Sequence, residues 1–393
     1  MEISRRRLAA VFAGSGAVGA AGAAVAAEGH AQDGGITLLP AGSALAAEVH
    51  SFHNWVLMPV MVGISLFVLA LLLYVMVRYN QKANPVARRF SHNTLVEIVW
   101  TGVPILILLF IALFSFDLLY KEDVMPDGRQ VVVQADGGAT TVVFPNDFTA
   151  KRKVTRPKHL DVIVENANGA EKLAYRTGFT VEGLGEEEVV VTLNETPPAG
   201  SNVIVRGGRS RVGPTKVLGL FGEDRTEIAT APTVTIKVSG YQWGWSYSYP
   251  DFGDFEITSN MLPENETTPE LYRLAVDNPV YIPAGETIRI TTTARDVIHS
   301  WALPNFAIKV DAVPGRINET WFKADVENTY YGQCSEICGI KHAFMPIEVR
   351  AVSREEFMAW VNEQRELNGM EPMAAAPAQP AVKTAAARLG ETQ

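Results

Sequence analysis

Two long apolar runs near the N-terminal end constrain the fold of this chain more than any other feature. They cover residues 55–77 and about 95–119, and each is long enough to cross a hydrocarbon core of roughly 30 Å as a helix. A buried core helix of a soluble protein is the alternative. The connecting residues 78–89 carry four basic side chains and no acidic one, which places this loop in the cytoplasm. We therefore expect a transmembrane hairpin within residues 32–120, with helices at about 51–79 and 94–120.

A basic cluster precedes an Ala/Gly-rich run at the start of the chain. Arg5, Arg6 and Arg7 are followed by small residues that continue to about Ala27, which is typical of a cleavable export signal. We assign residues 1–31 to this signal, with cleavage after Ala27 or Ala31 by the twin-arginine or the general secretory route. The signal and the basic loop together predict a multi-pass protein of a bacterial inner membrane, with both termini and everything after the second helix in the periplasm.

Charge and cysteine content narrow the classes of partner and fold. The 393 residues carry a formal net charge of -9 at pH 7, which argues against nucleic acid because phosphate binding needs clustered Lys and Arg. A basic partner would suit the chain better. Two cysteines are too few for the disulfide framework that stabilises small secreted domains.

The exported part shows the pattern of β-strands. Residues 233–238, 271–276, 286–293 and 346–352 alternate apolar and polar side chains between Pro, Gly and Asn. They predict an antiparallel sandwich or Greek-key barrel of the cupredoxin type over residues 233–352. In residues 353–393, we expect a short helix at about 354–367 and then a disordered tail, because the tail has few large apolar residues.

Residues 121–232 form an inserted exported segment with weaker signals. Strand-like stretches at 160–164, 188–193 and 202–206 predict a small β-domain, additional to the barrel. A basic cluster at 151–158 could bind anionic lipid headgroups, although a solvated surface is the commoner role of such a cluster. The function of this segment is not indicated by any motif.

A short loop before the last predicted strand carries a set of metal-binding side chains. Cys334, Cys338, His342 and Met345 lie within twelve residues, and His299 lies upstream. One thiolate, two imidazoles and a weak thioether make a mononuclear copper site, and the surplus cysteine suggests that two thiolates bridge two coppers. A disulfide between the cysteines is the alternative, since exported proteins favour it. Zinc would leave the soft Met345 unexplained.

Four stretches carry a resemblance to a known family. They are Gln242-Trp-Gly-Trp-Ser-Tyr-Ser-Tyr249, Asp296-Val-Ile-His-Ser-Trp-Ala-Leu-Pro304, Asp311-Ala-Val-Pro-Gly-Arg316 and Cys334-Ser-Glu-Ile-Cys-Gly-x-x-His-x-Phe-Met345. With the membrane hairpin and the β-barrel, they resemble subunit II of haem-copper (aa3-type) cytochrome c oxidases over residues 50–120 and 233–362. The insertion at 121–232 departs from the short connection that is usual in this family.

This resemblance implies a binuclear CuA centre and an electron-transfer function. Cys334 and Cys338 would bridge two copper ions, His299 and His342 would be terminal ligands, and Met345 and the Glu336 carbonyl would bind weakly. The Glu336 carboxylate would then be free to bind a magnesium ion shared with subunit I. The chain would pass electrons from cytochrome c to haem in subunit I, which reduces oxygen and pumps protons.

The resemblance also implies an electron entry point and a docking surface. Trp243 would receive the electron, although an aromatic residue on a strand is more often a core residue, and Trp245 could be that core residue. Four acidic residues near this strand are candidates to attract the basic haem edge of cytochrome c. They are Asp251, Asp254, Asp277 and Asp296.

Glu97, at the cytoplasmic start of the second helix, would lie at the mouth of a proton channel shared with subunit I. The spacing of Thr94 and Glu97 also fits a capping box, so the carboxylate could instead, or in addition, stabilise the helix N-terminus. Two other functions stay open, a copper-free subunit II of a quinol oxidase and the CuA donor of a nitric oxide reductase. The complete set of copper ligands disfavours the copper-free quinol oxidase subunit. The presence of Glu336 and Glu97 disfavours the nitric oxide reductase donor.

Overall fold

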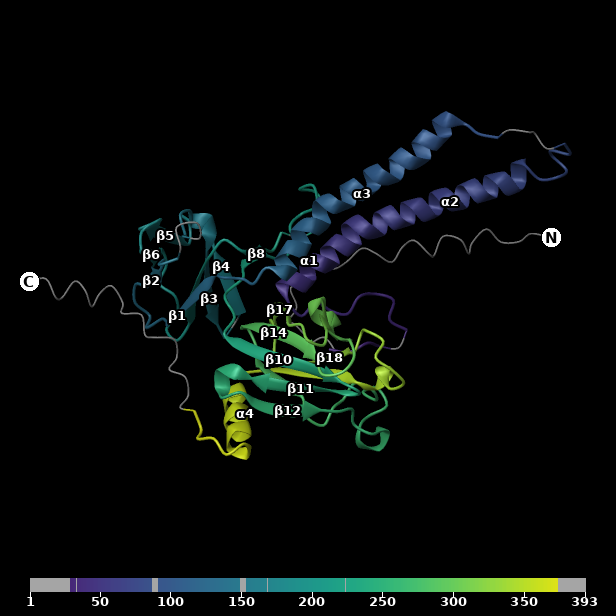
Figure 1. Ribbon diagram of the computed structural model, residues 1–393. Coiled ribbons are helices and arrows are strands. Elements are labelled where there is room, and N and C mark those ends of the chain that lie inside the picture. Colours follow the sequence, from purple (N-terminus) through teal and green to yellow (C-terminus); the bar gives the residue numbers. More distant parts are fainter. Residues whose placement is uncertain are drawn as a thin grey trace, which may run out of the picture.

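The computed structural model of the protein describes residues 29–32, 34–86, 91–148, 153–167, 169–222 and 224–373. Most of the predicted export signal lies outside these residues, as do the tail after residue 373 and Lys151 and Arg152 of the basic cluster. Three parts follow one another along the chain: a helical hairpin, an inserted β-domain and a β-barrel that carries the metal-binding loop. Figure 1 shows the hairpin projecting from one side of the two β-structures.

The hairpin consists of two long helical segments. The first comprises α1 (Ala44–Phe52), a π-helical turn (His53–Leu57) and α2 (Met58–Arg78), and the second is α3 (Thr94–Asp123). Both are apolar enough to span a membrane, and no residue of their most apolar windows is buried. Since a core helix of a soluble protein would be covered, the transmembrane interpretation is favoured. The first segment begins at Ala44 rather than near residue 51, because Ser43 caps it by accepting a hydrogen bond from the Ala46 amide.

The inserted segment folds as two small antiparallel sheets with an apolar core between them. One sheet has the order β1-β7-β3-β4 and the other β2-β6-β5. Buried valines that alternate along the strands form much of this core, as the pattern predicted. The extra β-rich part of the predicted fold class is therefore present. The strands are β1 (Arg129–Gln134), β2 (Thr141–Pro145), β3 (Leu160–Asn166), β4 (Gly169–Leu173), β5 (Phe179–Glu182), β6 (Glu188–Leu193) and β7 (Asn202–Gly207).

The barrel has a separate core and matches the predicted cupredoxin-like class. Its sheets have the orders β12-β11-β10-β14-β17, β13-β19-β18 and β15-β16. The pairs β10·β14 and β13·β19 are parallel, so the expectation of a purely antiparallel structure was wrong. Long connections separate the strands of each parallel pair, and parallel pairing requires such a crossover. The strands are β10 (Val234–Tyr241), β11 (Gly244–Tyr249), β12 (Phe255–Ser259), β13 (Val280–Pro283), β14 (Thr287–Ala294), β15 (His299–Leu303), β16 (Ile308–Ala312), β17 (Asn318–Lys323), β18 (Asn328–Gln333) and β19 (Pro346–Val352).

One predicted strand of the barrel is absent, and the predicted C-terminal helix is present. Residues 271–274 form a turn in which the Leu274 amide donates to the Leu271 carbonyl, and Arg273 has a φ of 70°. This left-handed residue interrupts the extended backbone that the apolar pattern of residues 271–276 had suggested. After the barrel, α4 (Arg354–Leu367) packs on it through buried Phe357 and Val361.

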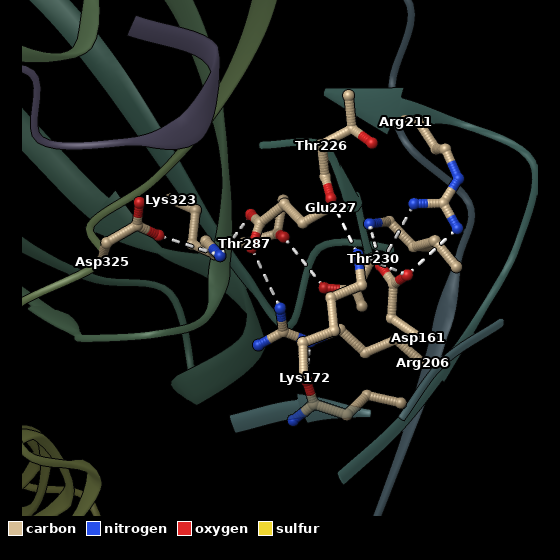
Figure 2. Close-up of polar contacts among 12 residues, drawn as sticks. Asp161, Lys172, Arg206, Arg211, Thr226, Glu227, Thr230, Thr287, Lys323 and Asp325 are labelled. Carbon is tan, nitrogen blue, oxygen red and sulfur yellow. Dashed lines mark hydrogen bonds and ion pairs between the residues drawn. The ribbon is translucent and has the colours of Figure 1, made fainter. Parts of the chain in front are cut away.

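Ion pairs connect the inserted β-domain to the barrel. Two short strands, β8 (Arg211–Val212) and β9 (Glu227–Ile228), lie between the two parts. Glu227 accepts a hydrogen bond from Arg206 of β7 at 3.1 Å and binds Lys323 of β17 at 2.5 Å. Lys323 also binds Asp325 at 2.9 Å, which extends the chain of charges shown in Figure 2. Glu227 thus joins a strand of one domain to a strand of the other.

A small apolar cluster fixes both β-structures to the outer end of the hairpin. Leu45 of α1, Leu118 of α3, Val212 of β8 and Trp321 of β17 are buried together. The Trp321 indole also donates to the carbonyl of Lys121 at 3.1 Å. The barrel and the inserted β-domain are therefore held beside the membrane surface by the same junction.

Candidate metal centre

The predicted metal-binding side chains lie on the loop 334–345, which connects two neighbouring strands. β18 and β19 are antiparallel and pair up to Gln333 and Pro346. The Cys334 amide donates to the Met345 carbonyl at 3.2 Å, so the loop closes on itself. The Ser335 amide donates to the carbonyl of Ser300, which follows His299 on β15. These backbone contacts bring a residue from a distant strand to the loop.

The two thiols face each other at the centre of this arrangement. Cys334 Sγ and Cys338 Sγ are 3.9 Å apart, and both cysteines are buried and free. A disulfide requires sulfur atoms about 2.05 Å apart, so these cysteines are not paired. Metal–thiolate bonds of about 2.3 Å would allow both sulfur atoms to contact the same two ions. The loop therefore presents two thiols in an arrangement that suits bridging.

The other predicted ligand atoms surround the thiols. His299 Nδ1 lies 3.9 Å from Cys334 Sγ, and His342 Nδ1 lies 3.6 Å from Cys338 Sγ. Met345 Sδ is 3.4 Å from Cys338 Sγ, and the Glu336 carbonyl oxygen is 3.3 Å from Cys334 Sγ. Among the residues that the structure describes, His299, Cys334 and Cys338 form the one compact group of three metal-binding side chains. Each of the other four predicted ligand atoms thus lies within 3.9 Å of one of the two sulfur atoms.

His299 is held in place by contacts on its far side. It is fully buried, and Asp296 Oδ1 lies 3.0 Å from its Nε2, which leaves Nδ1 directed at Cys334. Gly240 makes room for the ring, because a Cβ there would lie 2.8 Å from His299 Cδ2. The sequence alone predicts only a docking role for Asp296. Its spacing three residues before His299 was the available signal for this second contact.

The electrostatic environment distinguishes the two cysteines. Burial opposes ionisation of Cys334, but hydrogen bonds with His299 and with the backbone at Glu336 and Ser300 outweigh it and lower the pKa of this thiol. Burial and the neighbouring Cys334 raise the pKa of Cys338. Burial would lower the pKa of His299, but Cys334 and Asp296 outweigh it and raise this pKa. Cys334 is therefore the more readily available thiolate, the form that binds a metal.

Trp243 and Trp245 occupy different environments. Trp243 lies half-buried in the turn between β10 and β11, and its indole donates to the Cys338 carbonyl at 3.3 Å. The side-chain Nε2 of Gln242 donates to the same carbonyl at 2.7 Å. Trp245 is fully buried in the barrel core, as expected for the core residue of the pair, and its indole donates to the Met345 carbonyl at 3.4 Å. Trp243 therefore connects the outer surface to the metal-binding loop.

The four acidic residues predicted to attract a partner are exposed, and each also has contacts within the chain. Asp254 pairs with Lys237 at 3.1 Å. Lys341 lies 5.9 Å from the centre of the Trp243 ring and adds a positive charge there. Asp251 also accepts a hydrogen bond from the Thr235 backbone amide, Asp277 from those of Asn260 and Asn278, and Asp296 from that of Gln242.

Glu97 lies in the first turn of α3, at the opposite end of the hairpin from the metal-binding loop (Figure 1). Its Oε1 accepts a hydrogen bond from the Asn93 amide at 3.2 Å, and the Asn93 side chain accepts one from the Val96 amide. The residue that caps the helix is therefore Asn93 and not Thr94. The predicted stabilisation of the helix start holds with this change of partner.

Family models match two separate regions of the chain. The model described as cytochrome c oxidase subunit II, transmembrane domain, matches residues 31–118. The model described as the periplasmic domain of the same subunit matches residues 234–352. Residues 119–233, which contain the inserted β-domain, lie outside both matches. The two matched regions thus correspond to the hairpin and the barrel.

Comparison with individual proteins also finds subunit II of cytochrome c oxidases. The chain is 33% identical over 344 residues to a probable cytochrome c oxidase subunit 2 of Rickettsia felis, covering 87% of this chain and 76% of the relative. It is 49% identical over 132 residues to the cytochrome c oxidase subunit 2 of Drosophila simulans, covering 33% and 58%. The solved periplasmic domain of subunit II from Bradyrhizobium japonicum is 48% identical, with 35% of this chain and 98% of that chain covered and a TM-score of 0.34. The two family models and the relative from Rickettsia felis show that this chain belongs to the family of cytochrome c oxidase subunit II.

Proposed function

We propose that this chain is the electron-entry subunit of a haem-copper oxidase, with a binuclear CuA centre in the loop 334–345. Membership of the family makes it a membrane-bound subunit with an outside domain. The ligands would be the thiolates of Cys334 and Cys338, His299, His342, Met345 and the Glu336 carbonyl. Two copper ions bound there would supply a one-electron relay between cytochrome c and the haem of subunit I.

One observation carries this proposal above the others. Two free thiols lie 3.9 Å apart, and each faces the Nδ1 atom of a different histidine. A thioether sulfur completes the set beside Cys338. This combination of thiolate, imidazole and thioether is soft and selects copper over zinc, magnesium or calcium. A copper-free subunit would have no use for it.

The surrounding residues would hold this site in one geometry. Burial of both cysteines and of His299 excludes water from the ligands. Asp296 orients the His299 ring, and the amides of the loop are bonded to β15 and to the loop itself. A site held in this way changes little in shape when its charge changes, which favours rapid electron transfer.

The proposal includes an entrance and an exit for the electron. Trp243 would receive it from a docked cytochrome c, since its indole is partly exposed and bonded to the Cys338 carbonyl. The exposed Glu336 carboxylate would bind a magnesium ion at the contact with subunit I. The other magnesium ligands would have to come from that subunit. Glu97 would contribute to a proton channel at the cytoplasmic end of the hairpin.

A copper count with an electron spin resonance spectrum tests the proposal directly. The full chain, purified in detergent and loaded with copper, is expected to hold two copper ions and to show hyperfine splitting from two equivalent nuclei. Cys338→Ser should abolish this spectrum. Ser335→Ala is a matched control, because the Ser335 hydroxyl bonds only to the Gln333 carbonyl in the described contacts. A single-copper spectrum, or no bound copper, would overturn the binuclear centre.

A further inference from the structure

The segment 213–222, which follows β8, extends along the outer end of the membrane hairpin. The Phe221 ring stacks on the Trp55 ring with centroids 6.0 Å apart. A Cβ at Gly222 would lie 3.3 Å from Ser51 Oγ. Ser51 and Trp55 belong to the first membrane-spanning segment, and Trp55 begins its long apolar run. Figure 1 shows this teal segment beside α1 and the near end of α3.

The base of this segment is fixed to both helices. The Gly213 amide donates to Glu48 Oε2 of α1 at 3.0 Å. Glu48 also binds Lys121 of α3 at 2.6 Å. Val212, just before the segment, is buried in the apolar cluster with Leu118. The tip of the segment, residues 217–221, is therefore held at the level where the apolar run of the first helix begins.

The tip exposes large apolar side chains at this level. Leu218 is 68% exposed, Leu220 is 73% exposed and Phe221 is 50% exposed. They follow one another in the sequence Val217-Leu-Gly-Leu-Phe221 and so form one contiguous patch. Exposed patches of this kind mark binding to a membrane or to another protein. Their position beside the lipid-facing surface of Trp55, which is itself 49% exposed, makes the patch continuous with the surface of the hairpin.

The backbone of the tip suits a weakly hydrated environment. The Leu220 amide donates to the Val217 carbonyl in a turn whose central residues, Leu218 and Gly219, have φ values of 54° and 71°. The amides of Val217 and Phe221 are bonded to each other's carbonyls, so these donors need no water. A leucine in the left-handed region is strained. None of the described residues covers the Leu218 side chain, so it is available for contact with a molecule outside the chain.

Positive charges lie where lipid headgroups would be. Lys216 is exposed at the start of the tip, and a long lysine can direct its ammonium group towards phosphates. Arg209 lines a cavity that also contacts Tyr120 and Val124 at the end of α3. Arg211 lines the same cavity, but its charge is paired with Asp161, and Asp117 and Asp224 add acidic groups there. Basic side chains at this height complement an anionic membrane surface.

We propose that Leu218, Leu220 and Phe221 insert into the outer leaflet of the lipid bilayer and anchor the inserted β-domain to the membrane. The occupant of this apolar patch is lipid, because the patch continues the lipid-facing surface of the first membrane-spanning segment. Burial of the leucines in the acyl boundary would compensate for the strained turn. This anchoring does not depend on copper at the metal centre.

Depth-dependent fluorescence quenching tests this proposal. A small fluorescent amino acid is introduced by codon suppression at position 218 of the full chain, reconstituted in phosphatidylcholine–phosphatidylglycerol vesicles with or without lipids brominated in the acyl chain. Position 367 is the matched control, since Leu367 is 74% exposed and ends α4, on the side of the barrel away from the hairpin (Figure 1). We expect loss of most of the emission at 218 with brominated lipid and no loss at 367. The same label is then measured in the assembled oxidase.

The outcomes separate lipid from a protein partner. Quenching at 218 in both the free chain and the oxidase supports insertion into lipid. Quenching in the free chain alone would overturn the proposal, because another subunit would then cover the tip. Equal emission at 218 and 367 in both preparations would overturn it as well. Copper content does not enter these measurements, so the result is independent of the CuA proposal.

Discussion

The inserted β-domain and the barrel are both built from small sheets around separate apolar cores, yet they use buried polar groups differently. In the barrel, His299 is buried beside the metal-binding loop and is oriented by Asp296. In the inserted β-domain, Asp161 is buried in ion pairs with Lys172 and Arg211. Buried polar side chains therefore have different roles in two similar architectures. His299 in the barrel lies at the metal-binding loop, whereas Asp161 in the insertion links neighbouring strands through ion pairs.

The two parts also differ in how they reach the membrane. The barrel contacts the end of α3 through Trp321, and its metal-binding loop is not part of that junction. The inserted β-domain leads into the segment 213–222, which lies against the hairpin itself. This difference suggests that the insertion adds a membrane contact that the barrel alone lacks. Variants that affect one part and leave the other unchanged can test the comparison.

The largest effect is expected for Asp161→Asn. The side chain is 1% exposed and binds Lys172 at 2.8 Å, Arg211 at 3.0 Å and the Ile228 amide at 2.8 Å. Removing its charge should destabilise the inserted β-domain by about 2–3 kcal/mol, less than for a fully buried pair because both cationic partners are partly exposed. Amide exchange in β3 and β7 should become faster, while the copper spectrum stays unchanged.

Glu171→Gln, an exposed substitution on β4, is the control for Asp161→Asn and should leave exchange unaltered. Loss of the copper spectrum in Asp161→Asn would show that the two cores unfold together, and the comparison would fail. Unchanged exchange would show that the buried carboxylate adds no stability. The copper spectrum and the amide exchange can both be measured on the full chain.

Asp296→Asn should weaken copper binding in the barrel and leave the stability of the inserted β-domain unchanged. Without the carboxylate beside Nε2, the His299 ring loses its fixed orientation, and copper affinity should fall about 10–100-fold, as for other residues that support metal ligands. Competition with a copper chelator measures this change. Asp277→Asn is the matched control, since Asp277 is exposed and accepts hydrogen bonds from the backbone amides of Asn260 and Asn278 instead of contacting a predicted ligand.

Amide exchange in the inserted β-domain should be the same in Asp296→Asn as in the natural chain. Unaltered copper affinity would mean that the contact at 3.0 Å does not support the ligand. Asp296 would then keep only the docking role that its exposure and position suggested.

The sequence predicted more about the barrel site than about the insertion. Most candidate ligands of the site lie on one loop, whereas the insertion depends on contacts between residues that are distant in the chain. Cys334, Cys338, His342 and Met345 have a fixed spacing on one loop, so their types alone indicated a metal. The pairing of β18 with β19 closes this loop. The role of Asp296 required knowing which ring nitrogen of His299 faces the thiols. That direction depends on tertiary packing around Gly240, which no local pattern contains.

Alternation of apolar residues predicted β3, β6 and β7 of the insertion, but not which strands pair. The same pattern failed at residues 271–276, where local hydrogen bonds and a left-handed Arg273 form a turn. The apolar tip at 217–221 has no motif either. Its significance arises only from its position beside Trp55, more than 150 residues away in the chain. Long-range placement of this kind cannot be obtained from periodicity.

A smaller effect is expected for Trp243→Phe, which tests electron entry alone. Phenylalanine keeps the aromatic packing but loses the indole hydrogen bond to the Cys338 carbonyl. Electron transfer from reduced cytochrome c, followed by rapid mixing, should become slower with unchanged copper content. Trp360→Phe is a suitable control, because Trp360 belongs to α4 and stacks on Tyr281 of β13 rather than on the metal-binding loop. Unchanged kinetics in Trp243→Phe would remove its assigned role.

The smallest effect is expected from ionic strength. Acidic residues near Trp243 should attract a basic cytochrome c, and salt screens exposed charges over about 10 Å at 0.1 M. The decline in rate should be shallow, because Lys237 pairs with Asp254 and Lys341 places a positive charge over the Trp243 ring. Lys341→Gln should raise the rate at low salt and steepen its decline, since the opposing charge is removed. A rate that is independent of salt in both proteins would reject attraction by these acids and would leave apolar contact around Trp243 as the basis of docking.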